Sequence, residues 1–292
     1  MYMKHVLGAA LMLAFALPAD AQSDWTGVAK ALGKTGAQVS DQIYRIGLPR
    51  SDLKVTLDGV TLKPALALGS WLAFRSMGDH DAMVMGDLVL TQPEVNPVMK
   101  KLAEGGVEIT ALHNHLLRSE PTTMYMHVMG HGDPVKLADA LHAALLLSGT
   151  PFGDTPAAAA PPIDLDAAAI DQALGYKGKV NGGVYQIGIP RAETIKDGGM
   201  DVPEAMGSSI AINFQPTGDG KAATTGDFVL IGSEVNPVLR ALRENGIEVT
   251  AIHNHMLDDT PRLFFMHFWA NDDASRLAKG LRAALDQTAI RN

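Results

Sequence analysis

Residues 86–117 read GDLVLTQPEVNPVMKKLAEGGVEITALHNHLL, and residues 226–257 read GDFVLIGSEVNPVLRALRENGIEVTAIHNHML. The two stretches lie 140 positions apart and are identical at 19 of 32 positions. The similarity continues outward, since YRIGLPR at 44–50 matches YQIGIPR at 185–191 and a Met-His pair follows each stretch. Self-similarity of this extent at a nearly constant spacing indicates a duplicated domain.

The duplication predicts the domain boundaries. We expect a first repeat domain at residues 25–149, a linker rich in Pro and Ala at 150–162, and a second repeat domain at 163–292. The chain has 292 residues, of which 47% are hydrophobic, so each copy can bury a core of its own.

Turn residues and apolar runs predict the same elements in both copies: an opening helix, three strands, a helix, two strands and a last helix. In the first copy, Asn96 is expected to cap the middle helix, with Pro97 in its first turn. Strands at 107–115 and 123–129, joined through Pro121, predict a hairpin. This order predicts an α+β fold of two tandem α/β-sandwich domains, each a mostly antiparallel sheet with helices on one face.

The N-terminus has the pattern of a signal peptide at residues 1–21. Lys4 supplies a positive charge, residues 6–17 form an apolar run, and Ala19–Ala21 fits a cleavage site before Gln22. The run is too short to span a bilayer comfortably. We therefore expect a periplasmic or secreted protein that keeps no stable membrane anchor after cleavage.

Charge and cysteine content narrow the chemistry. The formal net charge is −8, which argues against binding to nucleic acid. There are no cysteines, so disulfides, thiolate metal sites and cysteine nucleophiles are excluded.

The histidines are the main candidates for function. His113 and His115 lie two apart on a predicted strand, so both should point to one face while Asn114 points away. If the hairpin pairs odd positions with odd, His127 joins the same face. The second copy repeats the set with His253, His255 and His267.

Three neutral imidazoles suit a transition metal such as Zn or Cu, and they leave a coordination position open for water or substrate. We expect one or two sites, one formed by the three histidines of each copy. Glu108 and Glu248 align between the copies and are the candidate catalytic carboxylates, although strand alternation places Glu108 opposite the histidines. A hydrogen-bonded histidine network and a metal-free ligand pocket are the alternatives.

Four further residues are candidates for ligand binding. Asn114 and Asn254 each lie between two histidines. Arg50 and Arg191 end matching strands, where each would bind an anion or form a salt bridge.

The EVNPV helix start, the HNH strand end and the following Met-His resemble the LppY/LpqO family (DUF1259), a duplicated exported bacterial domain of unknown function. The resemblance covers nearly the whole chain beyond the signal peptide. Described members are lipoproteins, whereas this chain lacks the cysteine that a lipid anchor needs. The resemblance implies no activity and no catalytic residues.

The residues together predict an exported protein that binds a transition metal and acts as a metal-dependent hydrolase on a small molecule. The alternative is a non-enzymatic protein that binds a metal or a small molecule.

Overall fold

A computed structural model of the chain describes residues 24–78, 80–153 and 162–291. The signal peptide predicted at 1–21 and most of the linker predicted at 150–162 therefore lie outside the described residues. Within the described ranges, no helix is both long and apolar enough to cross a membrane.

Each copy forms a six-stranded sheet with the same strand order, in which every neighbouring pair is antiparallel. In order across the first sheet, the strands are β1 (Ala37–Ser40), β2 (Ile43–Pro49), β5 (Gly69–Gly78), β6 (Asp81–Thr91), β8 (Thr123–Gly132) and β7 (Glu108–His113). Across the second they are β9 (Lys179–Asn181), β10 (Val184–Ile189), β13 (Ile210–Gly218), β14 (Lys221–Ile231), β17 (Leu263–Asp273) and β15 (Glu248–His253).

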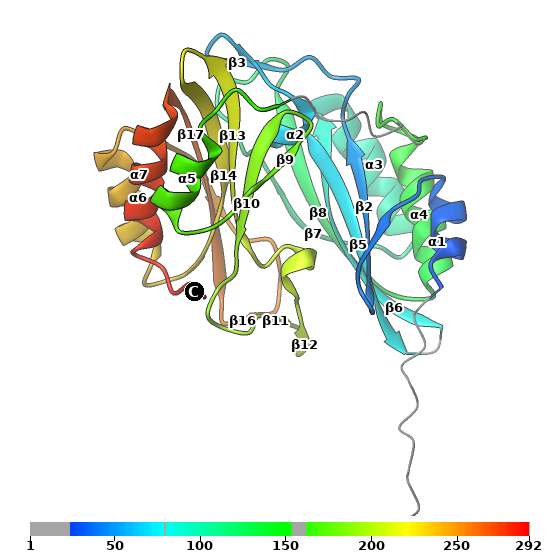
Figure 1. The fold of residues 1–292 in the computed structure, drawn as a ribbon. Coiled ribbons are helices and arrows are strands. Elements are labelled where there is room, and N and C mark those ends of the chain that lie inside the picture. Colours follow the sequence, from blue (N-terminus) through cyan, green and yellow to red (C-terminus); the bar gives the residue numbers. More distant parts are fainter. Residues whose placement is uncertain (1–23, 79, 154–161, 292) are drawn as a thin grey trace, which may run out of the picture.

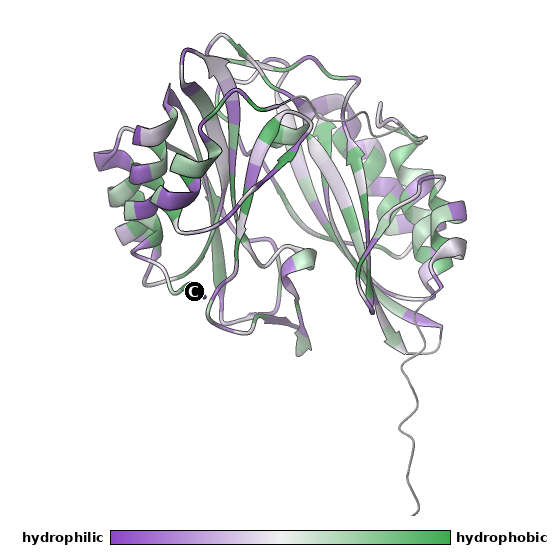
Figure 2. Ribbon diagram, viewed as in Figure 1, coloured by the Kyte–Doolittle hydropathy of each residue, from purple (hydrophilic) through white to green (hydrophobic). Residues whose placement is uncertain are grey.

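Three helices cover the outer face of each sheet (Figure 1). Those of the first copy are α1 (Thr26–Leu32), α3 (Gln92–Glu104) and α4 (Pro134–Leu145). Those of the second are α5 (Ala167–Leu174), α6 (Val235–Glu244) and α7 (Ala274–Leu285). Figure 2 shows both hydrophobic and hydrophilic residues on these helices, as expected for helices that pack one side against a sheet and expose the other. The predicted α+β class is confirmed.

The remaining elements are short and lie outside the two six-stranded sheets. They are β3 (Thr56–Leu57), β4 (Val60–Thr61), α2 (Pro64–Ala67), β11 (Lys196–Asp197), β12 (Met200–Asp201), the 3-10 helix η1 (Glu204–Met206) and β16 (Asp259–Thr260). Helix α2 of the first copy packs against β13 and β14 of the second sheet, so the copies are not independent bodies.

The predicted start of the middle helix is wrong in the first copy. Helix α3 begins at Gln92, with Thr91 as its N-cap, and Pro97 lies inside it. The Glu94 carboxylate accepts a hydrogen bond from the Thr91 backbone N–H at 2.7 Å, which satisfies a donor at the helix start. The N-cap of α3 therefore lies five residues before Asn96 in the sequence.

The inner faces of the two sheets face each other (Figure 1). Alternate residues of β6 point to opposite sides: Leu88 packs under the helices of its own copy, whereas Met85 packs into the core of the second copy. A further apolar cluster joins Tyr125 of the first copy to Trp269 of the second. The side chains that alternation sends to the inner face therefore meet those of the other copy.

Arg118 forms ion pairs with both copies at the surface of the protein. Its guanidinium forms ion pairs with Asp58 of its own copy at 3.0 Å and with Glu248 of the other at 2.8 Å. Trp269 donates from Nε1 to the same Asp58 at 3.0 Å. Three contacts thus converge on one junction between the copies.

Candidate metal centre

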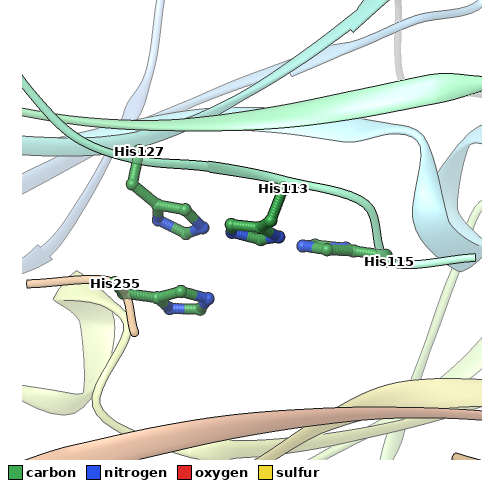
Figure 3. Close-up of side chains that lie close together, drawn as sticks. All are labelled: His113, His115, His127 and His255. Carbon is green, nitrogen blue, oxygen red and sulfur yellow. The ribbon is translucent and has the colours of Figure 1, made fainter. Parts of the chain in front are cut away.

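Six histidines meet between the two sheets. Figure 3 shows four of them, three from the first copy and one from the second. The rings stack in pairs across the copies, with ring centroids 3.5 Å apart for His113 and His253, 3.7 Å for His115 and His267, and 3.6 Å for His127 and His255. Each pair joins one copy to the other, so the cluster belongs to neither copy alone.

The pairing follows an internal two-fold relation. His115 corresponds to His255, and His127 corresponds to His267. The contact between His115 and His267 is therefore repeated, with the roles of the copies exchanged, as the contact between His127 and His255. This reciprocity is the geometry of a two-fold interface, here formed within one chain.

Strand pairing carries the histidines to the inner face as predicted. In the hairpin of the first copy, His113 lies opposite Tyr125, and Ala111 lies opposite His127, so odd positions pair with odd. Strand β7 ends at His113, two residues before the predicted end at residue 115, so His115 lies just beyond the strand. Thr250 of the other copy donates a hydrogen bond to the His115 carbonyl at 2.5 Å and positions this segment.

The histidines share one unusual property, which is a buried ring nitrogen without a partner. Within the part of the chain that the structure describes, no hydrogen bond reaches Nε2 of His113, His115, His127, His253, His255 or His267. A buried polar atom of this kind costs free energy unless a ligand satisfies it. His267 also contacts the Gly226 carbonyl through Nδ1 at 2.8 Å. A proton held on Nδ1 leaves the Nε2 lone pair free to bind a metal.

Donor atoms close enough to share a metal ion fall into three overlapping groups, each with all its atoms within 4.8 Å of one another. The groups are His113, His115, His127 and His255; His113, His115, His253 and His267; and Asp227, His255 and His267. The first predicted triad thus comes together and gains a histidine from the second copy. The second predicted triad does not form a group of its own, because its members are divided among all three. These buried clusters could hold a metal ion.

Two aspartates at the cluster, one buried (Asp87) and one half-buried (Asp227), were missed by the sequence reasoning. Asp87 lies opposite His127 on β8, and Asp227 lies opposite His267 on β17. The Oδ1 atom is 3.9 Å from Nε2 in the first pair and 3.8 Å in the second. Neither Oδ1 atom has a hydrogen-bond partner among the described residues. The signal was present in the quoted repeat, where a Gly-Asp pair recurs inside an apolar strand.

Burial shifts the pKa values of the six histidines and the two aspartates in the direction that favours the neutral form of each side chain. Desolvation lowers the pKa of His113 to about 4 and that of His253 to about 3, and lowers the other four histidine pKa values well below the usual value. Desolvation also raises the pKa of Asp87 to about 8 and that of Asp227 well above its usual value. The imidazoles are therefore neutral at neutral pH, as metal ligands must be.

A cavity of about 1220 Å³ lies between the sheets and reaches the cluster. Its lining includes four of the histidines and both aspartates: Asp87, His115, His127, Asp227, His255 and His267. Trp71 and Arg45 line another part of the wall. Small-molecule sites commonly have volumes of about 300–1000 Å³, so the cavity has room for a small molecule beside the cluster.

The candidate carboxylates Glu108 and Glu248 belong to none of the donor groups. A bulge between Ile109 and Ala111 reverses the strand alternation, so that Glu108 lies opposite Met129, on the face of the histidines. The prediction that Glu108 points the other way is therefore wrong. Glu108 is nevertheless exposed, and Glu248 is held by Arg118, so neither is placed as a helper at the cluster.

The candidate arginines are buried in salt bridges. The Arg50 guanidinium pairs with Asp52 at 2.8 Å and with Glu94 at 2.9 Å. Arg191 repeats the arrangement with Glu193 at 2.9 Å and Glu234 at 2.7 Å. Each arginine also donates to a backbone carbonyl, that of Val89 or Val229.

Neither Arg50 nor Arg191 lines the cavity at the cluster. The salt-bridge alternative therefore describes both residues, and the expectation that they bind a ligand is not supported by their positions.

The candidate asparagines bind the hairpin backbone. Asn114 donates from Nδ2 to the Leu116 carbonyl at 3.4 Å, and Asn254 donates to the Leu263 carbonyl. Neither belongs to a donor group or lines the cavity. Both asparagines shape the loop that presents His115 or His255.

A sequence profile described as Domain of Unknown Function (DUF1259) matches the chain twice, at residues 26–146 and 168–287. No curated protein sequence matches the chain. Two solved structures show distant similarity. A trimeric bacterial microcompartment shell protein, PduB, is 12% identical, with 88% of this chain and 95% of that chain covered and a TM-score of 0.21. EtuB from Clostridium kluyveri is 9% identical, with 86% and 90% covered and a TM-score of 0.19. At these scores, neither similarity defines the fold or the function.

Proposed function

The chain belongs to the DUF1259 family of duplicated domains, and we propose that it is an exported protein that binds a transition metal at the histidine cluster and hydrolyses a small molecule in the adjoining cavity. The observation that carries the proposal is the set of six buried Nε2 atoms without partners, gathered from both copies.

The donor set fits a metal of borderline softness. Neutral imidazoles with one or two carboxylates are the ligands that Zn and Cu take in proteins without thiolates. In the absence of a ligand, burial of so many unpaired nitrogens is unfavourable. A metal at the cluster would satisfy them and would draw its ligands from both copies, because both four-histidine groups do so.

Hydrolysis needs a Lewis acid, a proton acceptor and room for substrate. A bound divalent ion supplies the first, since it polarises a carbonyl or phosphoryl group and acidifies water. Asp87 and Asp227 are the proton acceptors that we propose once a bound cation favours their ionised forms, because both carboxyl groups adjoin the histidines and line the cavity. A metal carrier needs no space beyond the ion, so the volume of the cavity favours a catalytic role over a carrier.

Our proposal that the protein is exported rests on the signal-peptide pattern at residues 1–21. Expression of the full chain in a bacterium, followed by fractionation and N-terminal sequencing, tests it. We expect a mature chain that begins at Gln22 in the periplasm or medium. Full-length protein in the cytoplasm would contradict export.

Metal binding is tested on protein purified without a histidine tag. We expect His115→Gln and His267→Gln each to weaken Zn or Cu binding by at least about 100-fold, since each removes a ligand rather than an outer contact. His131→Gln is the matched control, because His131 is exposed on the same strand as His127.

The double variant then separates a shared centre from two independent sites. In a shared centre, His115→Gln with His267→Gln loses little more affinity than either single variant, because partners in one network are not additive. Two independent sites would instead lose half of the bound metal in each single variant.

Hydrolysis is tested with 4-nitrophenyl acetate and 4-nitrophenyl phosphate. We expect turnover that chelation abolishes, that added metal restores, and that Asp227→Asn lowers by about 10²–10⁴-fold as the loss of a proton acceptor. Metal bound at full occupancy without any turnover of either ester would favour the non-enzymatic alternative.

A further inference from the structure

The Arg45 side chain lies in the cavity wall, and among the described residues its guanidinium has no carboxylate partner. It lies on β2, is half-buried, and places its Cζ atom 4.1 Å from the centroid of the Trp71 ring. In the described ranges, its one hydrogen bond is from Nη1 to the carbonyl of Ala205 in the other copy. A guanidinium has five N–H donors, so most of them are free.

The two fully buried arginines of the described chain provide a contrast. Arg50 and Arg191 each contact two carboxylates, whereas no carboxylate of the described chain lies within ion-pair distance of Arg45. Asp87 would raise the pKa of Arg45 if it were ionised, but burial raises the pKa of Asp87 itself to about 8, so it is mostly protonated at neutral pH. Burial lowers the pKa of Arg45 to about 10, so the side chain is still cationic at neutral pH and incompletely stabilised.

The second copy does not repeat this cation. Gln186 stands at the matching position of the YQIGIPR stretch. Gln186 donates to the Ala65 carbonyl at 2.8 Å and accepts from Asn181 at 3.0 Å, so both ends of its amide are occupied. The two-fold relation that governs the histidines is therefore broken at this position of the cavity wall, where the first copy has a guanidinium and the second copy has an amide.

We infer that Arg45 is a specificity residue of the cavity and that the substrate is a small organic anion. Its carboxylate or phosphoryl group binds the free guanidinium N–H donors, which are held in place by Trp71 and Ala205. The reacting group of the same molecule then faces the histidines and Asp87, which line the same cavity. This inference rests on the proposed function, because it names the substrate class of that site.

Anion binding is tested on metal-free protein at pH 7.5, by calorimetric titration with inorganic phosphate and, separately, with benzoate. The histidines are neutral at this pH, so the cluster itself adds no positive charge. We expect wild-type protein to bind at least one of the anions. The preferred anion identifies the group as phosphoryl or carboxylate.

Arg45→Gln should weaken that binding by at least about tenfold, the effect of losing a charge-assisted hydrogen bond. The variant introduces the residue that the second copy carries at this position, so the fold should accept it. Arg45→Lys keeps the charge and should retain part of the affinity. Arg75→Gln is the control, because Arg75 is also half-buried and donates to a backbone carbonyl, but lies outside the cavity at the cluster.

Three results would overturn the inference: equal anion affinity in Arg45→Gln and wild type, an equal loss in Arg75→Gln, or no binding of either anion to wild-type protein. Because the titration needs neither metal nor turnover, its failure is distinct from failure of the proposed hydrolase.

Discussion

Replacement of Asp87 by asparagine is expected to stabilise the metal-free protein while weakening its affinity for metal. Asp87 is 7% exposed, and its Oδ1 atom has no hydrogen-bond partner in the described structure. An ionised carboxylate in this place is destabilising, so the folded metal-free protein keeps the group protonated. Asparagine has nearly the same shape and no charge, so it removes both the free-energy cost of a buried carboxylate and a ligand of the proposed metal.

The magnitude follows from the pKa values. Burial raises the pKa of Asp87 to about 8 from an ordinary value of 3.8. The folded state therefore binds more protons than the unfolded state between these values, and wild-type stability is lost as the pH rises through this window. At about 1.4 kcal/mol per pH unit, the loss reaches about 4 kcal/mol at pH 7 and about 1–2 kcal/mol at pH 5. Asp87→Asn should recover up to these amounts.

The assay is urea unfolding of metal-free protein at pH 5 and pH 7, with Asp139→Asn as an exposed control. We expect the stability gain of Asp87→Asn over wild type to grow with pH, and the stabilisation by added Zn or Cu to shrink. A destabilised Asp87→Asn variant, a gain that does not depend on pH, or unchanged metal affinity would refute the reasoning.

Two further predictions concern the same region. His113 has a pKa lowered to about 4 from 6.5, so the folded state binds fewer protons than the unfolded state between these values and loses stability as the pH falls. Between pH 6.5 and pH 4, the unfolding free energy of metal-free His113→Gln should therefore fall by about 3 kcal/mol less than that of wild type, as measured by urea unfolding. Parallel pH profiles of the two proteins would contradict this. Arg50→Met should cost about 3–5 kcal/mol in unfolding free energy, because it leaves Asp52 and Glu94 without their partner. A lowered metal affinity in folded Arg50→Met would contradict its structural role.

The hairpin illustrates how far strand periodicity reaches. Alternation and an odd-with-odd register placed His113 and His127 on one face, and the observed pairing has that register. The same alternation failed for Glu108, because one bulge between Ile109 and Ala111 exchanges the faces of the residues beyond it. A bulge is a local departure from periodicity that the alternating pattern does not reveal.

The missed aspartates show a different limit. Asp87 and Asp227 recur in the repeat, which marks them as unusual, but the sequence does not reveal which residues lie opposite them in the sheet. Their role became visible when β8 and β17 placed His127 and His267 directly opposite them. Cross-strand neighbours depend on which strands pair, and this pairing joins segments about 40 residues apart.

The sequence by itself determined the duplication, the α+β class and the identity of the six histidines, because repeats, periodicity and residue chemistry are local properties of the chain. The tertiary structure alone decided that the histidines form one cluster across both copies. The contact between His113 and His253 joins residues 140 positions apart, and it exists because the apolar inner faces of the two sheets pack against each other. Packing between the two sheets decides which residues of the two copies meet, and no pattern within one repeat contains that information.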